Sequence, residues 1–143
     1  MAEKIITKWK EGMAFEWTVN NHKLTIDAEE RVGGKDKGPQ PKPFMLASLG
    51  GCAAMDVISI LKKMRVTENI EDFQVNVEGH MTDEHPKHYD KMHTTYTFKA
   101  KEGEELPMKK LEKAVSLSED RYCGVTHVYK QTMELTSEII IAE

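Results

Sequence analysis

The segment from Phe44 to Met64 constrains the fold of this 143-residue chain more than any other, because it is apolar on two sides. Along one side, apolar residues recur at three- and four-residue steps, as they do on one face of a helix. These residues are Leu46, Leu49, Ala53, Val57, Ile60 and Met64. A second apolar line contains Met45, Cys52 and Met55. Such a helix needs a sheet or a partner on more than one side, so the sequence predicts a long central helix.

The residues at the start and in the middle of this helix carry further information. Residues 28–41 are polar and rich in Gly and Pro, which predicts a loop. Pro43 then suits the first turn of the helix, where its missing N–H costs nothing. Gly50 and Gly51 lie in the middle, where each glycine costs about 1 kcal/mol relative to alanine. We therefore expect another backbone or a substrate to approach the helix closely at these glycines.

Alternating apolar and polar residues predict strands on both sides of the helix. Residues 4–27 indicate a meander of two or three strands, with the pair Asn20–Asn21 at a turn with positive φ. The other expected elements are strands at 73–78 and 94–99, a helix that begins at Pro107, a short helix at 122–130 and a final strand at 133–141. This order predicts an α+β fold with antiparallel sheet. The length of the chain favours a single domain over residues 1–143.

The charge distribution limits the partners that we expect. Charged residues make up 31% of the chain, and both signs are interspersed around a net charge of −4. No basic block could attract a phosphate backbone, so we expect no nucleic-acid partner. The start of the chain, 1–4, lacks the apolar stretch of a secretory signal. The longest uncharged apolar run, 44–55, is shorter than the roughly 20 residues that span a bilayer. We therefore expect a soluble, cytoplasmic protein that does not bind membranes.

The two cysteines, Cys52 and Cys123, are too few for a structural disulfide framework. Cys52 follows the Gly–Gly pair of the central helix and is either a small core residue or a reactive thiol. Cys123 precedes an expected helix, whose unpaired N–H groups favour a thiolate. Burial as an inert thiol is an equally good interpretation of Cys123. Because the two residues are far apart in the sequence, their spacing does not show whether they meet.

Four histidines lie in the predicted hairpin between the strands at 73–78 and 94–99. They are His80, His85, His88 and His93. Their segment is rich in charge and lacks a strong zinc spacing, so we interpret them as solvated and expect no metal and no other cofactor. His127 lies four residues after Cys123 and could pair with it as a nucleophile. No orienting Asn or Asp and no oxyanion hole can be identified, so a Cys–His hydrolase ranks low.

Two segments of the chain resemble the signature regions of the OsmC/Ohr family. The first is GPQPKPFMLASLGGCAAMDV at 38–57, with a Gly-Pro-x-Pro entry and a small-residue pair before Cys52. The second is LSEDRYCGV at 117–125, which resembles the region around the second cysteine of the family. The order of the expected elements also matches. The resemblance implies an OsmC-like fold, in which antiparallel sheets wrap around a long central helix within an intertwined homodimer.

The resemblance also implies a reaction. In the family, the first cysteine attacks an organic hydroperoxide and becomes a sulfenic acid, and the second cysteine captures this sulfenic acid as a disulfide. The resemblance implies that these two cysteines are Cys52 and Cys123. A dithiol reductant, lipoyl-bearing in some members, then restores both thiols. We therefore predict a thiol-dependent peroxidase for defence against oxidative stress, with Arg31 as the cation that activates Cys52. The alternative is a non-catalytic dimeric module that holds a small apolar ligand in the same pocket.

One position departs from the pattern of the family. A glutamate at the start of the central helix holds the activating arginine in the family, whereas this chain has Pro43. The acidic residues that could replace this glutamate are Glu29, Glu30 and Asp36. Asp56 lies one helical turn beyond Cys52. If its carboxylate faced the sulfur, it would raise the pKa of the thiol.

Overall fold

The computed structural model describes residues 1–143 and has the α+β architecture that the sequence predicts. The chain forms two compact units, 1–45 and 46–143, and each unit contains one three-stranded sheet. The boundary falls in the first turn of α1 (Phe44–Lys63), the long helix expected at 44–64. Our expectation of a single domain over residues 1–143 stays a prediction.

The N-terminal unit contains an antiparallel meander of β1 (Ile6–Glu11), β2 (Ala14–Val19) and β3 (His22–Ile26). Asn20 and Asn21 connect β2 to β3 with φ angles of 48° and 68°. This confirms the expected turn, because asparagine is among the few residues that tolerate a positive φ.

Asp27 organises the loop that follows β3. Its buried carboxylate accepts hydrogen bonds from the backbone N–H groups of Ala28 at 2.7 Å, Lys35 at 3.3 Å and Lys37 at 3.1 Å. Burial opposes ionisation, but the three N–H groups and the Lys37 ammonium outweigh it and hold the pKa of Asp27 below its ordinary value. The ionised carboxylate therefore fixes the backbone of this loop.

At Gly34 the same loop passes very close to its own backbone. A Cβ atom at this position would lie 1.9 Å from the carbonyl oxygen of Ala28, so only glycine fits there. Between Ala28 and Gly34 the chain forms η1 (Glu30–Val32), a short 3-10 helix that carries Arg31. The loop thus presents Arg31 on a backbone that is held at both of its ends.

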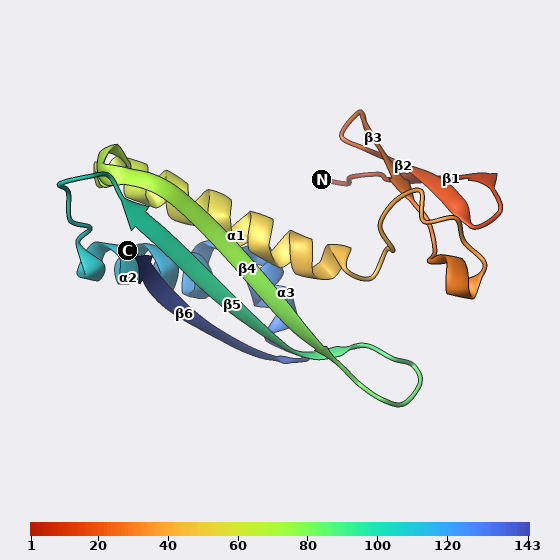
Figure 1. Cartoon of the computed structure of the whole chain (residues 1–143). Helices are drawn as coiled ribbons and strands as arrows, with labels where there is room; N and C mark the ends of the chain where they lie inside the picture. The colour runs from red at the N-terminus through yellow and green to blue at the C-terminus, as the bar shows by residue number, and fades with distance from the viewer. The chain divides into compact units, whose positions relative to one another are not determined.

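The C-terminal unit contains a sheet in the order β4–β5–β6, shown from green to dark blue in Figure 1. β4 (Ile70–Met81) and β5 (Tyr89–Ala100) form the expected antiparallel hairpin. β6 (Glu134–Ala142), in contrast, runs parallel to β5, so the prediction of antiparallel sheet is wrong for this strand. The reason is the long helical connection, which lets the chain return before it forms β6. The connection consists of α2 (Met108–Leu117), the π-helical turn η3 (Ser118–Tyr122) and α3 (Gly124–Tyr129).

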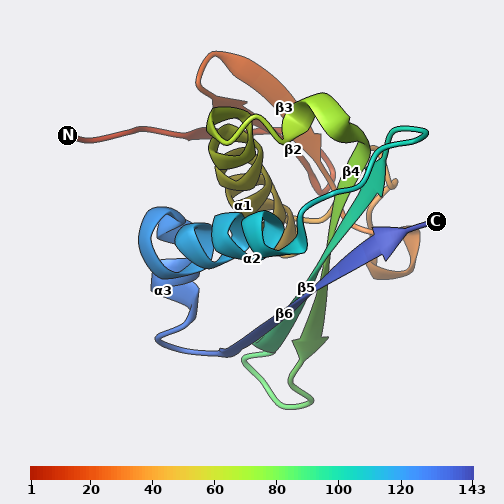
Figure 2. The same cartoon turned by 90° about the vertical axis from the view of Figure 1, so that its left-hand side faces the viewer.

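The helices α1, α2 and α3 lie on one face of this sheet, as Figure 2 shows. Buried side chains of α1 and α2 form the core together with those of β5 and with Val66. The core residues are Ala53, Val57, Leu61, Val66, Tyr96, Phe98, Leu111, Ala114 and Val115. Phe73 stacks on Phe98 at the edge of this cluster, with ring centroids 4.5 Å apart. The apolar stripe predicted along α1 is buried or half-buried throughout, which confirms this side of the helix.

The glycine pair and the second apolar line of α1 behave differently from the stripe. A Cβ atom at Gly50 would lie 3.2 Å from Cγ2 of Val77, so a side chain of β4, and not its backbone, lies close there. Gly51 is exposed, and a Cβ atom at this position would meet nothing within 4 Å. Met55, one turn further on, is 76% exposed. The approach of a backbone or a substrate at the glycine pair therefore stays a prediction. On the second apolar line, Met45 and Cys52 are half-buried, and Met55 is uncovered in the single chain.

By length and composition, α1 is apolar enough to cross a membrane, with a mean hydropathy of 1.8. This differs from our expectation from the uncharged run at 44–55, because the helix stays apolar on both sides of Asp56. Central helices of soluble proteins share this composition, and the stripe of α1 packs in the core described above.

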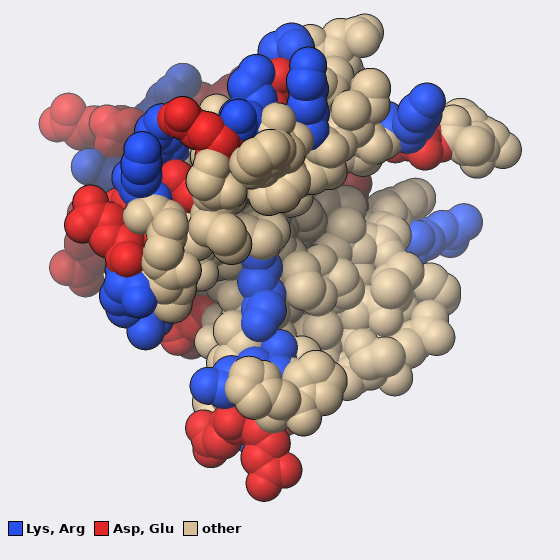
Figure 3. Space-filling view, turned by 90° about the vertical axis from the view of Figure 1, so that its right-hand side faces the viewer, with Lys and Arg blue, Asp and Glu red and all other residues tan.

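Charged side chains of both signs lie together on part of the surface. On the face shown in Figure 3, Lys and Arg side chains are interspersed with those of Asp and Glu. This agrees with the interspersed pattern of the sequence and its net charge of −4. That the chain has no nucleic-acid partner stays a prediction.

Candidate dithiol site

Cys52 and Cys123 come together in the C-terminal unit, although they are far apart in the sequence. Cys52 is half-buried on α1, and Cys123 is a buried residue immediately before α3. Both are free thiols. Their Sγ atoms and a carboxylate oxygen of Asp56 all lie within 4.8 Å of one another. The packing of α3 against α1 therefore creates a site with two sulfurs and one carboxylate.

Cys123 is the N-cap residue of α3, as expected for a cysteine at the start of a helix. Its Sγ accepts a hydrogen bond from the backbone N–H of Thr126 at 3.4 Å. The π-helical turn η3 leads directly into this cap, and the N–H of Cys123 donates to the carbonyl oxygen of Ser118 at 2.7 Å. Short π-helical segments of this kind are frequent at functional sites. Here the turn ends α2 and places Sγ of Cys123 on the side of α1.

Ser118 holds the carboxylate of the site. Its hydroxyl donates to Oδ2 of Asp56 at 3.0 Å, and the serine side chain is completely buried. In the sequence, Ser118 continues the apolar stripe of Leu111, Ala114 and Val115 along the helix that begins at Pro107. A polar residue on a buried stripe was the available signal, because such a group needs a partner inside the protein. Its partner, Asp56, lies on another helix and could not be identified from the spacing.

The surroundings of Cys52 disfavour its thiolate. Burial is the largest cause that raises its pKa above the ordinary value, followed by the hydrogen bond with Cys123. The N–H of Val125 acts in the opposite direction, and the negative charge of Asp56 adds to the rise. This is the effect expected for a carboxylate one turn beyond the cysteine. Within this unit, Cys52 therefore lacks the electrostatic support that a reactive thiolate needs.

A cavity of about 170 Å³ opens beside the site. Thr126, whose N–H group bonds to Cys123, forms part of its wall, together with Tyr96, Glu119 and Lys130. The Tyr96 hydroxyl donates to Oε1 of Glu119 at 3.3 Å. Burial and the Glu119 charge raise the pKa of Tyr96, so this tyrosine is neutral at physiological pH. Neither sulfur lines the cavity.

Arg31 belongs to the N-terminal unit, where Glu29 orients it. Its Nε donates to Oε2 of Glu29 at 2.6 Å, and Nε2 of Gln40 donates to the other carboxylate oxygen at 2.6 Å. These two hydrogen bonds lower the pKa of Glu29, and Glu29 in turn raises that of Arg31. Of the three acidic residues considered as replacements for the family's glutamate, Glu29 is therefore the one that binds the arginine. The contribution of Gln40 was not expected from the sequence.

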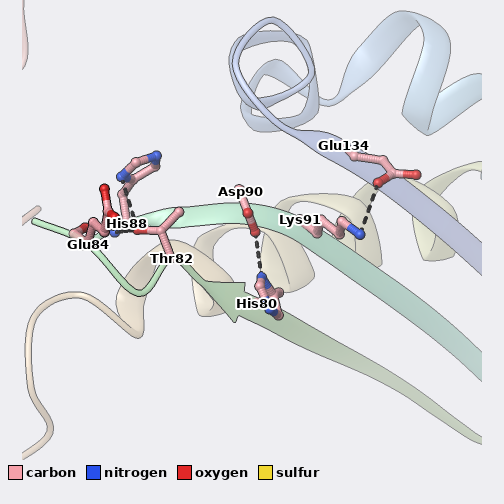
Figure 4. Close-up of polar contacts among 7 residues, drawn as sticks. All are labelled: His80, Thr82, Glu84, His88, Asp90, Lys91 and Glu134. Carbon is pink, nitrogen blue, oxygen red and sulfur yellow. Dashed lines mark hydrogen bonds and ion pairs between the residues drawn. The ribbon is translucent and has the colours of Figure 1, made fainter. Parts of the chain in front are cut away.

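Three of the four histidines of the hairpin have partners on the facing strand, in the hairpin turn or, for His93, on β6. Nδ1 of His80 lies 2.7 Å from Oδ1 of Asp90, and the N–H of His88 donates to Oγ1 of Thr82 at 3.1 Å (Figure 4). These side chains are exposed, as expected for solvated residues. His127 is also exposed, and the N–H group that reaches the Cys123 sulfur belongs to its neighbour. No hydrogen bond thus supports a nucleophilic pair of Cys123 and His127.

Fold and site together define a class of small α+β proteins in which a long helix and a helical cap bring two free thiols together. A profile of the family described as OsmC-like protein matches residues 34–138, which include both cysteine-bearing signature segments. The chain therefore belongs to the OsmC-like family, and the resemblance identified in the sequence is confirmed.

Relatives agree with this assignment over nearly the whole chain. Protein YhfA of Escherichia coli K12 is 28% identical over 130 residues, which cover 90% of each chain. A solved structure of a hypothetical protein from Aquifex aeolicus VF5 has a TM-score of 0.80 at 26% identity, over 100% of this chain and 99% of that one. An organic hydroperoxide resistance protein OsmC from Legionella pneumophila shares the fold, with a TM-score of 0.66 at 13% identity over 98% of each chain.

Proposed function

We propose that the chain is a thiol-dependent peroxidase that reduces organic hydroperoxides in the cytoplasm, as a defence against oxidative stress. The observation that carries this proposal is the meeting of two free thiols, Cys52 and Cys123, within 4.8 Å in the C-terminal unit. Membership of the OsmC-like family supports it, since a relative of the same fold is named an organic hydroperoxide resistance protein.

The proposed reaction has two chemical steps. The Cys52 thiolate attacks the hydroperoxide ROOH, an S–O bond forms as the O–O bond breaks, and the alcohol ROH leaves with one proton. Cys123 then attacks the Cys52 sulfenic acid, so that an S–S bond forms and water leaves. A disulfide has an S–S length of about 2.05 Å, so the two side chains must move closer by small rotations. A dithiol reductant, such as one that carries a lipoyl group, resets the site by two thiol–disulfide exchanges.

The first step requires a cation near Cys52, because burial, Cys123 and Asp56 disfavour the thiolate. We assign this role to Arg31, as the family resemblance implies. The pair formed by Glu29 and Gln40 supports the assignment, because it orients the guanidinium as the family's glutamate would. Glu29 would thus replace the glutamate that is absent at Pro43.

We further propose that the protein acts as an intertwined homodimer. Met55 is 76% exposed on α1, and the adjacent Gly51 leaves room for another backbone. Burial of apolar surface is favourable by roughly 25 cal/mol per Å², and a second copy related by two-fold symmetry would bury this side of both helices.

The alternative is a dimeric module that binds a small apolar ligand without catalysis and uses Cys52 only for packing. The raised pKa of Cys52 favours this alternative within the single chain. The two proposals differ in the fate of the sulfur, since only the peroxidase oxidises Cys52 during turnover.

The decisive experiment is the reduction of cumene hydroperoxide by the Cys52→Ser variant with a dithiol donor. We expect the variant to lose turnover, while Ser59→Ala, an exposed substitution on the same helix, keeps the wild-type rate. Wild-type turnover in the Cys52→Ser variant would show that this sulfur is not the nucleophile. An inactive wild-type protein that binds an apolar ligand would favour the alternative.

A further inference from the structure

The dithiol site also has the composition of a metal centre. Sγ of Cys52, Sγ of Cys123 and a carboxylate oxygen of Asp56 form the one group of three potential ligands in the chain whose atoms all lie within 4.8 Å of one another. We propose that the reduced site binds a single thiophilic divalent ion of the Zn²⁺ type through these three side chains. The inference shares its cysteines with the proposed function but does not require the peroxidase reaction.

The geometry suits a small tetrahedral ion. A Zn–S bond is about 2.3 Å long and a Zn–O bond about 2.0–2.2 Å, so two sulfurs on one ion lie less than about 4.6 Å apart. The three ligand atoms approach this separation before any ion enters, and small side-chain rotations would close the rest. Asp56 and Cys52 lie one turn apart on α1, and Cys123 faces them from the cap of α3. Three protein ligands leave a fourth position for water, as in many catalytic zinc sites.

Groups around the three ligands already hold them in place. The hydroxyl of buried Ser118 donates to Oδ2 of Asp56 and so orients the carboxylate. The N–H group of Thr126 donates to the Cys123 sulfur, and that of Val125 points to the Cys52 sulfur. Such supporting hydrogen bonds orient the ligands of metal sites and increase their affinity. The site is therefore pre-arranged, whereas the exposed histidines of the hairpin have other partners.

Charge and redox state follow from this ligand set. Two thiolates and one carboxylate carry three negative charges, of which a divalent ion neutralises two, and binding releases the two thiol protons. Formation of the Cys52–Cys123 disulfide removes both sulfur ligands. Oxidation of the occupied site by a hydroperoxide would consume two protons and yield the disulfide, the free ion, one alcohol and one water. Metal binding should therefore be confined to the reduced protein.

The test uses Co²⁺ as a spectroscopic probe of the full-length protein, reduced and stripped of metal under anaerobic conditions. We expect one Co²⁺ per chain with sulfur-to-cobalt charge-transfer absorption, which Zn²⁺ then displaces. Cys52→Ser and Cys123→Ser should each diminish this absorption, and the isosteric Asp56→Asn should weaken binding by about 10-fold or more. The control His80→Ala should bind like the wild type, and protein oxidised with diamide should not bind. Far-UV circular dichroism checks that each variant is folded.

The possible results separate this inference from the proposed function. Three results would overturn the three-ligand site. The reduced wild type could bind no Co²⁺, it could bind one ion per two chains, or the Asp56→Asn variant could bind with wild-type affinity. A protein that reduces cumene hydroperoxide but binds no Co²⁺ contradicts this inference alone. A protein that binds Co²⁺ one to one but never reduces a hydroperoxide contradicts the proposed function alone.

Discussion

Removal of the Ser118 hydroxyl should destabilise the protein, because this buried group is the described donor to the Asp56 carboxylate, at 3.0 Å. A hydrogen bond to a charged group is worth about 1.5–3 kcal/mol. Asp56 is half-buried, so water can replace part of the lost interaction, and we expect the lower end, about 1.5–2 kcal/mol, for Ser118→Ala. The matched control is Ser116→Ala, which removes an exposed hydroxyl that donates to Asp120 at 3.2 Å. Such a surface change should cost less than about 0.5 kcal/mol.

Urea unfolding of the reduced protein, followed by circular dichroism at one fixed protein concentration, measures both effects. With a slope of about 2 kcal/mol per M, Ser118→Ala should lower the midpoint by roughly 0.75–1 M without a change in slope. A double-mutant cycle with Asp56→Asn should give a coupling free energy of at least about 0.5 kcal/mol. Equal losses for Ser118→Ala and Ser116→Ala, or a coupling energy of zero, would refute the reasoning.

Four further predictions concern the thiols and the assembly. After a hydroperoxide pulse, intact mass should show a disulfide in the wild type but added oxygen in Cys123→Ser, because no thiol captures the sulfenic acid; identical masses would disprove the pairing. Asp56→Asn should lower the pKa of Cys52, seen as faster alkylation at neutral pH. Because burial and its neighbours raise this pKa on folding, the reduced wild type should lose stability as the pH rises above about 8.5, and Asp56→Asn should lose less. The unfolding midpoint should rise with protein concentration, and a stable monomer of 16.3 kDa in sedimentation equilibrium would contradict a dimer.

Many residues of the candidate site could be predicted from the sequence, but most of the hydrogen bonds between them could not. The two cysteines were found because each lies in a short segment that resembles a family signature. Asp56 was found because a helix places residues four positions apart on one side. Ser118 and Gln40 were missed as partners, since Ser118 bonds to a group on another helix and Gln40 to a group across a loop. The sequence offered three acidic residues that could bind Arg31 and did not single out Glu29. A loop has no regular period, so the sequence does not show which of its side chains meet.

By itself, the sequence determined the features that depend on neighbouring residues. The periodic apolar stripe and Pro43 gave α1 as 44–64, against the observed Phe44–Lys63, and Asn20–Asn21 gave the turn between β2 and β3. Only the tertiary structure decided that β6 runs parallel to β5 and that the Cys52 and Cys123 sulfurs meet beside a carboxylate. The physical reason is that periodicity encodes which side of an element is apolar but not which element covers it. That choice depends on how α2, η3 and α3 pack together on the sheet, and this packing brings the Cys123 sulfur to α1.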